Sequence, residues 1–434
     1  MATKCGGSSS SRKTLKDCVR HFTPAWFAVI MGTGAISILF HNYPYADNST
    51  PMKMFTYIFF FLNLALLVVF NVLTLARYII FPDIWGIMIR HPVQSLYIGC
   101  YPMGAATLIN IGVGLIYEEY SFGGRGFLYF LWACWWVDVI LSFICAFALP
   151  LYRNRKTIQD HALSRMTAIW LLPVVTLIVA SSSGGVLAPA LLPLSEYHAL
   201  LTLTLSAFMV AVGLALAFMI LTMYLLRLIV YGVPQGASVI SVFIPLGPMG
   251  QGGYSILLLG QGFRTILPLK NNSQVLTDAA TGETINVICV CVAFVLWALG
   301  TMWLLYAILA VQEVLRSTRF PFKLPFWGLI FPNGVYANLT IQLYRDLDIN
   351  SLRVWGAIYS GVTLCLWIIV FIRTLTMLRS GAIFESPCIE EIDMARGMEK
   401  HTEEAKGKDN AQVFYQNGSG DGSATGALVT SQSM

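Results

Sequence analysis

Residues 21–37 have the sequence HFTPAWFAVIMGTGAIS, an apolar run that begins near a proline and contains Gly-Thr-Gly at its middle. Pro24 suits the first turn of a helix, because the N–H group that proline lacks would have no intrahelical partner there. Gly32 and Gly34 let another backbone or a permeating solute approach the helix closely. The stretch therefore predicts a membrane-spanning helix interrupted at its middle, and similar features recur along the chain.

The composition indicates a membrane protein. The chain has 434 residues, of which 56% are hydrophobic and only 11% are charged, whereas about 25% of the residues in a typical soluble domain are charged. About 20 apolar residues suffice to cross the hydrocarbon core of a bilayer. The sequence predicts an all-α polytopic membrane protein with ten such spans, near residues 24–41, 55–81, 93–116, 127–151, 167–189, 199–229, 237–262, 285–311, 325–344 and 353–378.

The predicted domain organisation is one transmembrane domain with a short segment on each side. Residues 21–384 form the ten-helix transporter domain. Residues 1–20 are polar and Ser-rich, and residues 385–434 are first charged and then rich in Gly, Ser, Thr and Ala. Such compositions bury too little apolar surface to fold, so both segments are expected to be disordered.

The positions of Lys and Arg predict the orientation in the membrane, since cytoplasmic loops carry an excess of both. With the N-terminus taken as cytoplasmic, 21 of the 27 Lys and Arg residues lie on the inner side. The remaining six lie in outer loops: Lys53, Arg125, Arg264, Lys270, Arg345 and Arg353. Both termini are therefore predicted to face the cytoplasm.

The odd-numbered spans share prolines and small residues that the even-numbered spans almost lack. Prolines at 102, 173, 245 and 332 are separated by 71, 72 and 87 residues, and Met31-Gly32 precedes Met103-Gly104 by 72. Each interval is the length of one helical hairpin. The pattern predicts an internal repeat of five hairpins, each with one irregular and one regular helix.

This repeat predicts an arrangement around a pore. Proline and glycine free backbone polar groups that lipid cannot satisfy, so such segments are tolerated only against protein or a water-filled cavity. The alternative is that small residues only allow helices to pack closely. Because the feature recurs five times, we predict an inner ring of kinked odd-numbered helices around a central pore and an outer ring of even-numbered helices.

Several stretches resemble a known family. His21–Phe27 with Met31–Gly34 resembles the opening of fungal members of the tellurite-resistance/dicarboxylate transporter family, which includes plant slow anion channels, fungal malate transporters and fungal sulfite efflux pumps. Residues 101–106, 132–138 and 168–175 are similar to the sulfite-pump branch. The resemblance covers roughly residues 20–385. It implies ten helices in five hairpins around a pore, and a homotrimer with one pore per subunit.

The resemblance also implies that an aromatic side chain of the ninth helix closes the pore. Phe331, just before Pro332, is at the expected position, although it could instead only pack a helix interface; Phe322 and Phe326 lie nearer the cytoplasmic end. The odd-numbered helices have no Lys or Arg at their middles, so an anion would meet hydroxyls, amides and backbone N–H groups. The predicted pathway residues are Gly32, Thr33, Gly34, Met103, Thr107, Asn110, Thr176, Ser181, Ser182, Gln251, Asn333 and Asn338. Each hydroxyl could alternatively bond a carbonyl of its own helix.

Asp138 is the one acidic residue deep in a predicted span, beside Trp132, Trp135 and Trp136. Intramembrane carboxyls are costly and are functional candidates, so Asp138 could couple protons. Its place on an even-numbered helix favours a structural hydrogen-bonding role. The six histidines lack the spacing of metal ligands, and no metal or other cofactor is predicted.

Transport is the function that these features predict. The chain lacks the G-x-x-x-x-G-K-[ST] loop of an ATP-driven pump. It also lacks the paired carboxylates, His cluster or activated nucleophile that an enzyme would need within the spans. Its net charge of +5 gives no case for nucleic-acid binding. With the resemblance, we predict efflux of sulfite or bisulfite across the plasma membrane through a gated pore, driven by the membrane potential, with proton coupling left open. The alternatives are a malate/dicarboxylate transporter, a less selective anion channel, and a membrane scaffold or receptor. The lack of pore arginines favours a small monoanion over a dicarboxylate.

Overall fold

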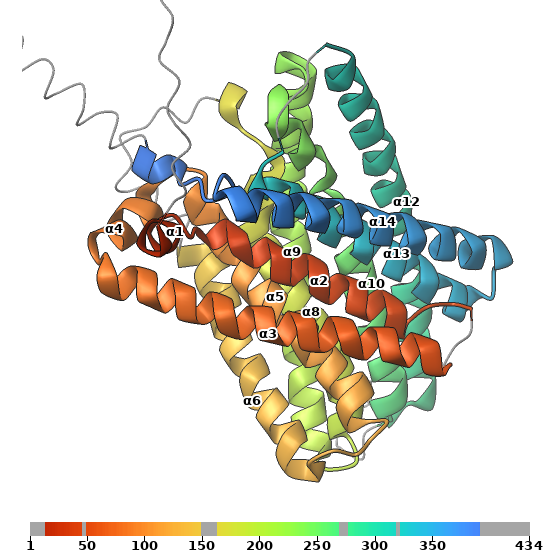
Figure 1. Cartoon of the computed structure of the whole chain (residues 1–434). Coiled ribbons are helices and arrows are strands. Elements are labelled where there is room, and N and C mark those ends of the chain that lie inside the picture. Colours follow the sequence, from red (N-terminus) through yellow and green to blue (C-terminus); the bar gives the residue numbers. More distant parts are fainter. Residues whose placement is uncertain (1–13, 46–48, 149–162, 269–276, 318–321, 391–434) are drawn as a thin grey trace, which may run out of the picture. The chain divides into compact units, whose positions relative to one another are not determined.

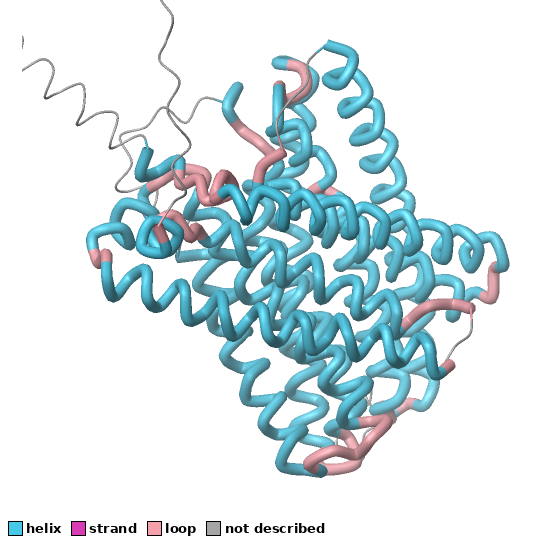
Figure 2. The backbone as a smooth tube through the Cα atoms, viewed as in Figure 1, coloured by secondary structure: helices cyan, strands magenta, loops and turns pink. Residues whose placement is uncertain are grey.

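The computed structural model describes residues 14–45, 49–148, 163–268, 277–317 and 322–390. Within these residues the regular structure is helical and no strand occurs (Figure 2). The chain divides into two compact units, Met1–Glu385 and Ser386–Met434. Of the second unit only residues 386–390 are described, and they include a single helical turn. The architecture below is that of the first unit.

Five long helices leave many of their apolar side chains partly or fully exposed. Only 17–39% of the residues in their most hydrophobic windows are buried, as expected for helices that face lipid. Four of these helices are 31 residues long or more. The five are α3 (Thr50–Ile80), α6 (Gly124–Phe143, continued by the π-helical η4, Ile144–Ala148), α9 (Glu196–Tyr231), α12 (Ala279–Ser317) and α14 (Asn350–Ser380).

Five other helices are buried and alternate with the exposed ones along the chain. In four of them 78–94% of the hydrophobic window is buried, and in the fifth every residue from 330 to 343 is buried. The buried helices are α2 (Phe27–His41), α5 (Cys100–Ile111, continued by the π-helical η3, Gly112–Tyr117), α8 (Leu172–Leu191), α10 (Leu246–Ile266) and α13 (Ile330–Leu347).

Each buried helix is preceded by a 3₁₀ segment. These segments are η1 (Pro24–Trp26), η2 (Gln94–Gly99), η6 (Ala168–Leu171), η7 (Gly236–Phe243) and η8 (Leu324–Leu329). The recurring prolines lie at this transition, where a missing N–H costs no intrahelical hydrogen bond. The irregularity that all five odd-numbered spans share therefore lies at their beginning. The predicted interruption at Gly32-Thr33-Gly34 is wrong, because α2 runs as one α-helix through these residues.

Contacts between helices follow the predicted hairpins. Helix α2 contacts α3, α5 contacts α6, α8 contacts α9, α10 contacts α12, and α13 contacts α14. The buried helices also contact one another in the cyclic order α2, α5, α8, α10, α13 and back to α2. Figure 1 shows α2 running beside α3 and α14.

The helical, polytopic fold class is thus confirmed, but not every detail of it. Among the described residues, nine helices are long and apolar enough to cross a membrane, and the polar α13 is not one of them. The count of ten spans, and the ring around a central pore, stay predictions.

The N-terminal segment differs from the expectation of disorder where it is described. Residues Leu15–Arg20 form helix α1, which begins with a capping box in which Thr14 and Asp17 each bond the backbone N–H of the other. Residues 1–13 and 391–434 lie outside the described part of the chain, so their predicted disorder stays a prediction. Short elements that complete the fold are α4 (Asp83–Arg90) and η5 (Leu163–Arg165).

The close contact between α10 and α13 yields a stability prediction. A Cβ atom at Gly250 would lie 2.7–2.9 Å from backbone atoms of Val335 and Tyr336, which cannot rotate away as a side chain can. We expect Gly250→Ala to lower the free energy of unfolding by about 1–3 kcal/mol. Thermal unfolding of the purified protein in detergent measures this effect.

Gly247, three residues earlier in the same helix, provides the matched control. A Cβ atom there would meet no atom within 4 Å, and alanine favours helix over glycine. Gly247→Ala should therefore unfold at the same temperature as the unaltered protein or slightly above it. Equal destabilisation by both substitutions would contradict the proposed contact.

Candidate functional site

Two cavities follow one another along the buried helices. The first, at the end where these helices begin, offers about 40 Å³ of space to the centre of a water-sized sphere. The second lies farther along the helices and offers about 10 Å³ of such space, roughly the room for one water molecule. All five buried helices or their 3₁₀ segments contribute to the first cavity, and Phe331 lines both cavities. We call them the N-terminal cavity and the C-terminal cavity.

The lining residues occupy equivalent positions in the five repeats. In the N-terminal cavity, one level consists of Met31, Met103, Val175, Gly247 and Phe331, which are 72, 72, 72 and 84 residues apart. In the C-terminal cavity, the residues Ala35, Thr107, Val179, Gln251 and Val335 have the same intervals. The five buried helices thus present corresponding faces to the two cavities.

Local helix geometry explains which residues face the cavities. Around the N-terminal cavity the lining positions are three residues apart, as in Pro325, Gly328 and Phe331, because side chains at i and i+3 align in a 3₁₀ helix. Around the C-terminal cavity, α13 contributes Phe331 and the residues three, four and seven positions after it, which are Gly334, Val335 and Asn338. Residues with these spacings lie on one face of an α-helix.

Phe331 lies at an apolar level between the cavities. Its side chain is 3% exposed, and the residues of its level are Met31, Met103, Val175 and Gly247. The glycine contributes no side chain, so the aromatic ring is the largest group at this level.

The C-terminal cavity has a mixed, mainly apolar lining, and four predicted pathway residues meet there: Thr107, Asn110, Gln251 and Asn338. The Thr107 hydroxyl donates to Gly104 O at 2.7 Å and accepts from Asn63 Nδ2 at 3.1 Å. Gln251 Nε2 donates to Ser182 Oγ. The Asn110 Oδ1 atom is buried and has no hydrogen-bond partner among the described residues. Uncharged donors from α5, α10 and α13 therefore converge on one space, where they could hydrogen-bond an anion.

Other predicted polar residues lie in neither cavity lining. Thr33 accepts from Trp367 Nε1 at 3.2 Å, and Ser181 bonds Ser206 O at 2.7 Å. Thr176 and Asn333 donate to carbonyl oxygens of their own helical segments, Pro173 O at 2.7 Å and Leu329 O at 2.6 Å. Thr176 and Asn333 thus follow the alternative of bonding their own helix, whereas Thr33 and Ser181 bond neighbouring helices.

Gly32 and Gly34 of the opening stretch also pack against neighbouring helical segments and do not face a cavity. A Cβ atom on Gly32 would lie 3.1 Å from Ile330 Cβ and 3.4 Å from Trp327. On Gly34 it would overlap Thr107, whose hydroxyl oxygen would be only 1.9 Å away. The structure therefore places both glycines at packing contacts, and neither lines a cavity. Met103, by contrast, lines the N-terminal cavity.

Residues that the sequence did not single out lie beyond Asn338. The Asn338 Oδ1 atom accepts from Asn42 Nδ2 at 2.8 Å, and Asn42 Oδ1 accepts from Arg345 Nη1 at 3.5 Å. Asn42 follows α2 directly and carries no pattern that marks it as functional. The lining residues Met31 and Tyr254 could have been found by combining the 72-residue interval with helical spacing.

Asp138 of α6 is 3% exposed, and neither of its carboxyl oxygens has a hydrogen-bond partner among the described residues. The neighbouring turns of the same helix do bond α8: Trp135 Nε1 donates to Ala180 O at 2.8 Å, and Ser142 Oγ donates to Thr176 O at 3.3 Å. The expected hydrogen-bonding role of Asp138 is therefore wrong for the described residues, and the bonds between α6 and α8 are made by Trp135 and Ser142 instead. Asp138 lines neither cavity, and no group of three or more potential metal ligands occurs in the described ranges.

An unpaired buried carboxyl predicts a stabilising substitution. We expect Asp138→Leu to keep or raise the unfolding temperature in detergent, because burial of an unsatisfied polar group is costly. Trp135→Phe, one turn earlier, removes a hydrogen bond and should cost about 1 kcal/mol. If Asp138→Leu were the more destabilising change, the carboxyl would have a stabilising partner after all.

Comparison with known proteins agrees with this architecture. Residues 21–375 match the model of the voltage-dependent anion channel family, SLAC1. Sulfite efflux pumps of Arthroderma benhamiae and Arthroderma otae are each 32% identical to this chain, over 357 residues (82% of this chain, 91% of the relative) and 369 residues (85% and 94%). The malic acid transport protein of Schizosaccharomyces pombe is 22% identical over 362 residues (82% and 78%).

The matches bear on the class of the protein as well as on its fold. The family is one of anion channels, and the relatives are named as transport proteins and not as enzymes. They confirm the resemblance, which covers roughly residues 20–385. The protein is a multi-pass membrane protein, and it belongs to the voltage-dependent anion channel family.

Proposed function

We propose that the protein exports sulfite or bisulfite from the cell through a gated anion path that runs through both cavities. The observation that carries this proposal is the position of Phe331, which lines both cavities at an apolar level and so separates them. Four curated relatives that bear the name sulfite efflux pump, among them those with 31% and 32% identity, support the choice of anion.

The chemistry of the path suits a small monoanion. Among the described residues that line the two cavities, none is Lys, Arg, Asp or Glu. Amides and hydroxyls replace part of the hydration shell of an ion without holding it as a guanidinium would. An inside-negative membrane potential favours anion exit by roughly 2.3 kcal/mol per charge per 100 mV. Efflux therefore needs no other energy source.

The second candidate is transport of malate or another dicarboxylate. The match to a malic acid transport protein supports it, at 22% identity. A dicarboxylate would favour bidentate recognition by arginine, which the described cavity linings lack. Sulfite is for this reason the first choice. Plasma-membrane location, cytoplasmic termini and a homotrimeric assembly with one path per subunit complete the proposal.

Anion flux into liposomes that contain the purified protein tests the proposed substrate. We expect sulfite flux to exceed malate flux by at least about tenfold, the ratio that corresponds to 1.4 kcal/mol of discrimination. Empty liposomes give the background. Faster malate flux would favour the second candidate. Absence of flux for sulfite, malate, chloride and nitrate alike would support a scaffold or receptor role.

The proposed gate is tested by Phe331→Ala. Removal of the ring joins the two cavities, so sulfite flux at zero applied potential should rise at least about tenfold. Phe326 lies in the preceding 3₁₀ segment, packs against Phe322 with ring centroids 4.9 Å apart and lines neither cavity. Phe326→Ala is the matched control and should leave flux within about twofold. Equal flux for both variants at equal expression would reject Phe331 as the gate.

A further inference from the structure

The C-terminal cavity ends at a row of three polar side chains. Arg345 of α13 donates from Nη1 to Asn42 Oδ1 at 3.5 Å and from Nη2 to the Asn42 backbone oxygen at 3.3 Å. Asn42 Nδ2 donates to Asn338 Oδ1 at 2.8 Å. Asn42 is 8% exposed and Asn338 is 4% exposed, whereas Arg345 is exposed. A surface cation is thus linked through one buried amide to a second amide that lines the cavity.

The chemistry of arginine gives this row a direction. A guanidinium has only N–H donors and no acceptor. Asn42 must therefore turn its carbonyl oxygen toward Arg345, which leaves its NH₂ group for Asn338. Asn338 in turn must offer its oxygen to Asn42, so its NH₂ group faces the cavity lining, where it hydrogen-bonds the Tyr254 hydroxyl and keeps its second N–H for an anion. The orientation of both amides follows from the one residue that cannot accept a hydrogen bond.

This orientation matters because an asparagine can present either a donor or an acceptor. An NH₂ group facing the cavity attracts an anion, whereas a carbonyl oxygen at the same place repels it. The charge of Arg345 also polarises the chain of hydrogen bonds and strengthens the last donor. Arginine itself stays outside the cavity, so the anion meets a strengthened donor without forming a tight ion pair.

We propose that Arg345 is a positioning residue that acts through Asn42 to hold Asn338 with its amide N–H groups toward the transported anion. This inference rests on the proposed anion path. It identifies the residues that turn hydrogen-bond donors, and not acceptors, toward the C-terminal end of that path. It differs from simple attraction of anions by a surface charge, because it requires the intervening Asn42 side chain.

The test compares the half-saturating sulfite concentration of variants in proteoliposomes. Arg345→Gln removes the donor-only group, and Asn42→Leu breaks the link while leaving the charge. Each should raise the half-saturating concentration about tenfold or more, the effect of losing one hydrogen bond to a charged group. The double variant should be no worse than either single variant, because both changes interrupt the same row. Arg345→Lys keeps a donor-only group and should stay within about threefold of the unaltered protein.

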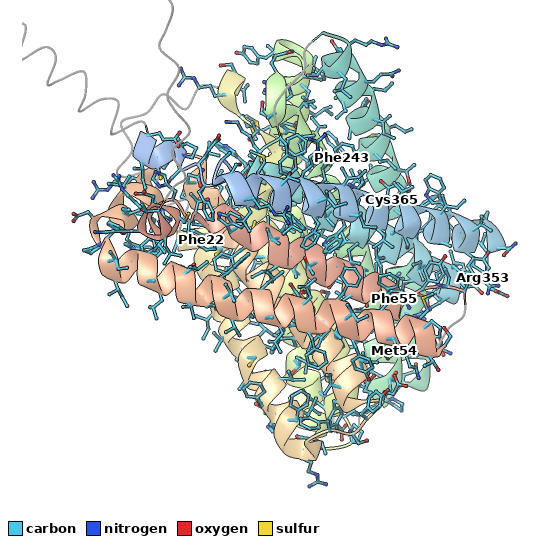
Figure 3. All side chains as sticks on the ribbon, in the orientation of Figure 1. Phe22, Met54, Phe55, Phe243, Arg353 and Cys365 are labelled. Carbon is cyan, nitrogen blue, oxygen red and sulfur yellow. The ribbon has the colours of Figure 1, made fainter. Side chains whose placement is uncertain are left out.

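Arg353 supplies the matched control for charge. It lies at the start of α14 (Figure 3), donates to Pro44 O at 3.2 Å, two residues from Asn42, and stacks on Tyr45. Arg353→Gln removes the same charge near the same chain segment without touching the row, and should change the half-saturating concentration by less than about threefold. Equal effects of Arg345→Gln and Arg353→Gln would overturn the inference, because charge alone would then explain both.

The remaining outcomes are also decisive. Additive effects of Arg345→Gln and Asn42→Leu, or an unaltered half-saturating concentration in Asn42→Leu, would overturn the inference while sulfite transport by the unaltered protein stands. If the unaltered protein carried no sulfite, malate, chloride or nitrate, the proposed function would fail and the inference with it. Unfolding temperatures of all variants separate a loss of affinity from a loss of fold, and Arg345→Gln keeps the test valid if Asn42→Leu does not fold.

Discussion

A backbone N–H or C=O group that leaves the α-helical hydrogen-bond ladder finds no partner in lipid. This constraint explains why the same five helices are both irregular at their beginnings and buried. Each begins with a 3₁₀ segment, near a recurring proline. In the described residues no such segment begins the five helices that alternate with them, and most residues in the hydrophobic windows of these helices are not buried. Burial of the irregular segments gathers five helix beginnings around one space.

The repeat makes that space nearly five-fold in position but not in chemistry. Equivalent positions supply Met31, Met103, Val175, Gly247 and Phe331 at one level. Phe331 can place a bulky ring at this level because the equivalent residue of another repeat is Gly247. A Cβ atom built on Gly247 would meet no atom within 4 Å, so the space beside it is open. At the next levels the repeats diverge again, into apolar residues on α2 and α8 and polar ones on α5, α10 and α13. Repetition therefore supplies equivalent lining positions, and the residues at these positions differ from one repeat to the next.

Much of the fold could be predicted from the sequence, since hydropathy and the 72-residue interval are properties of the chain itself. The facing direction of a residue inside a wholly buried helix could not. All of α2 around Gly32-Thr33-Gly34 is buried, so the apolar pattern has no polar face that reveals which side meets the cavity. Thr33 faces Trp367, a residue 334 positions away, and no local signal announces such a partner.

The same limit explains why the row behind Asn338 could not be foreseen. Its members are separated by 296 and 303 positions, and each alone is an ordinary polar residue near a helix end. Their meaning arises from the order in which they touch, because only the donor-only arginine gives the two amides a fixed orientation. The proposed path, which must bind an anion weakly and release it, would gain from this arrangement, because the charge of Arg345 would orient a donor through an amide without trapping the ion.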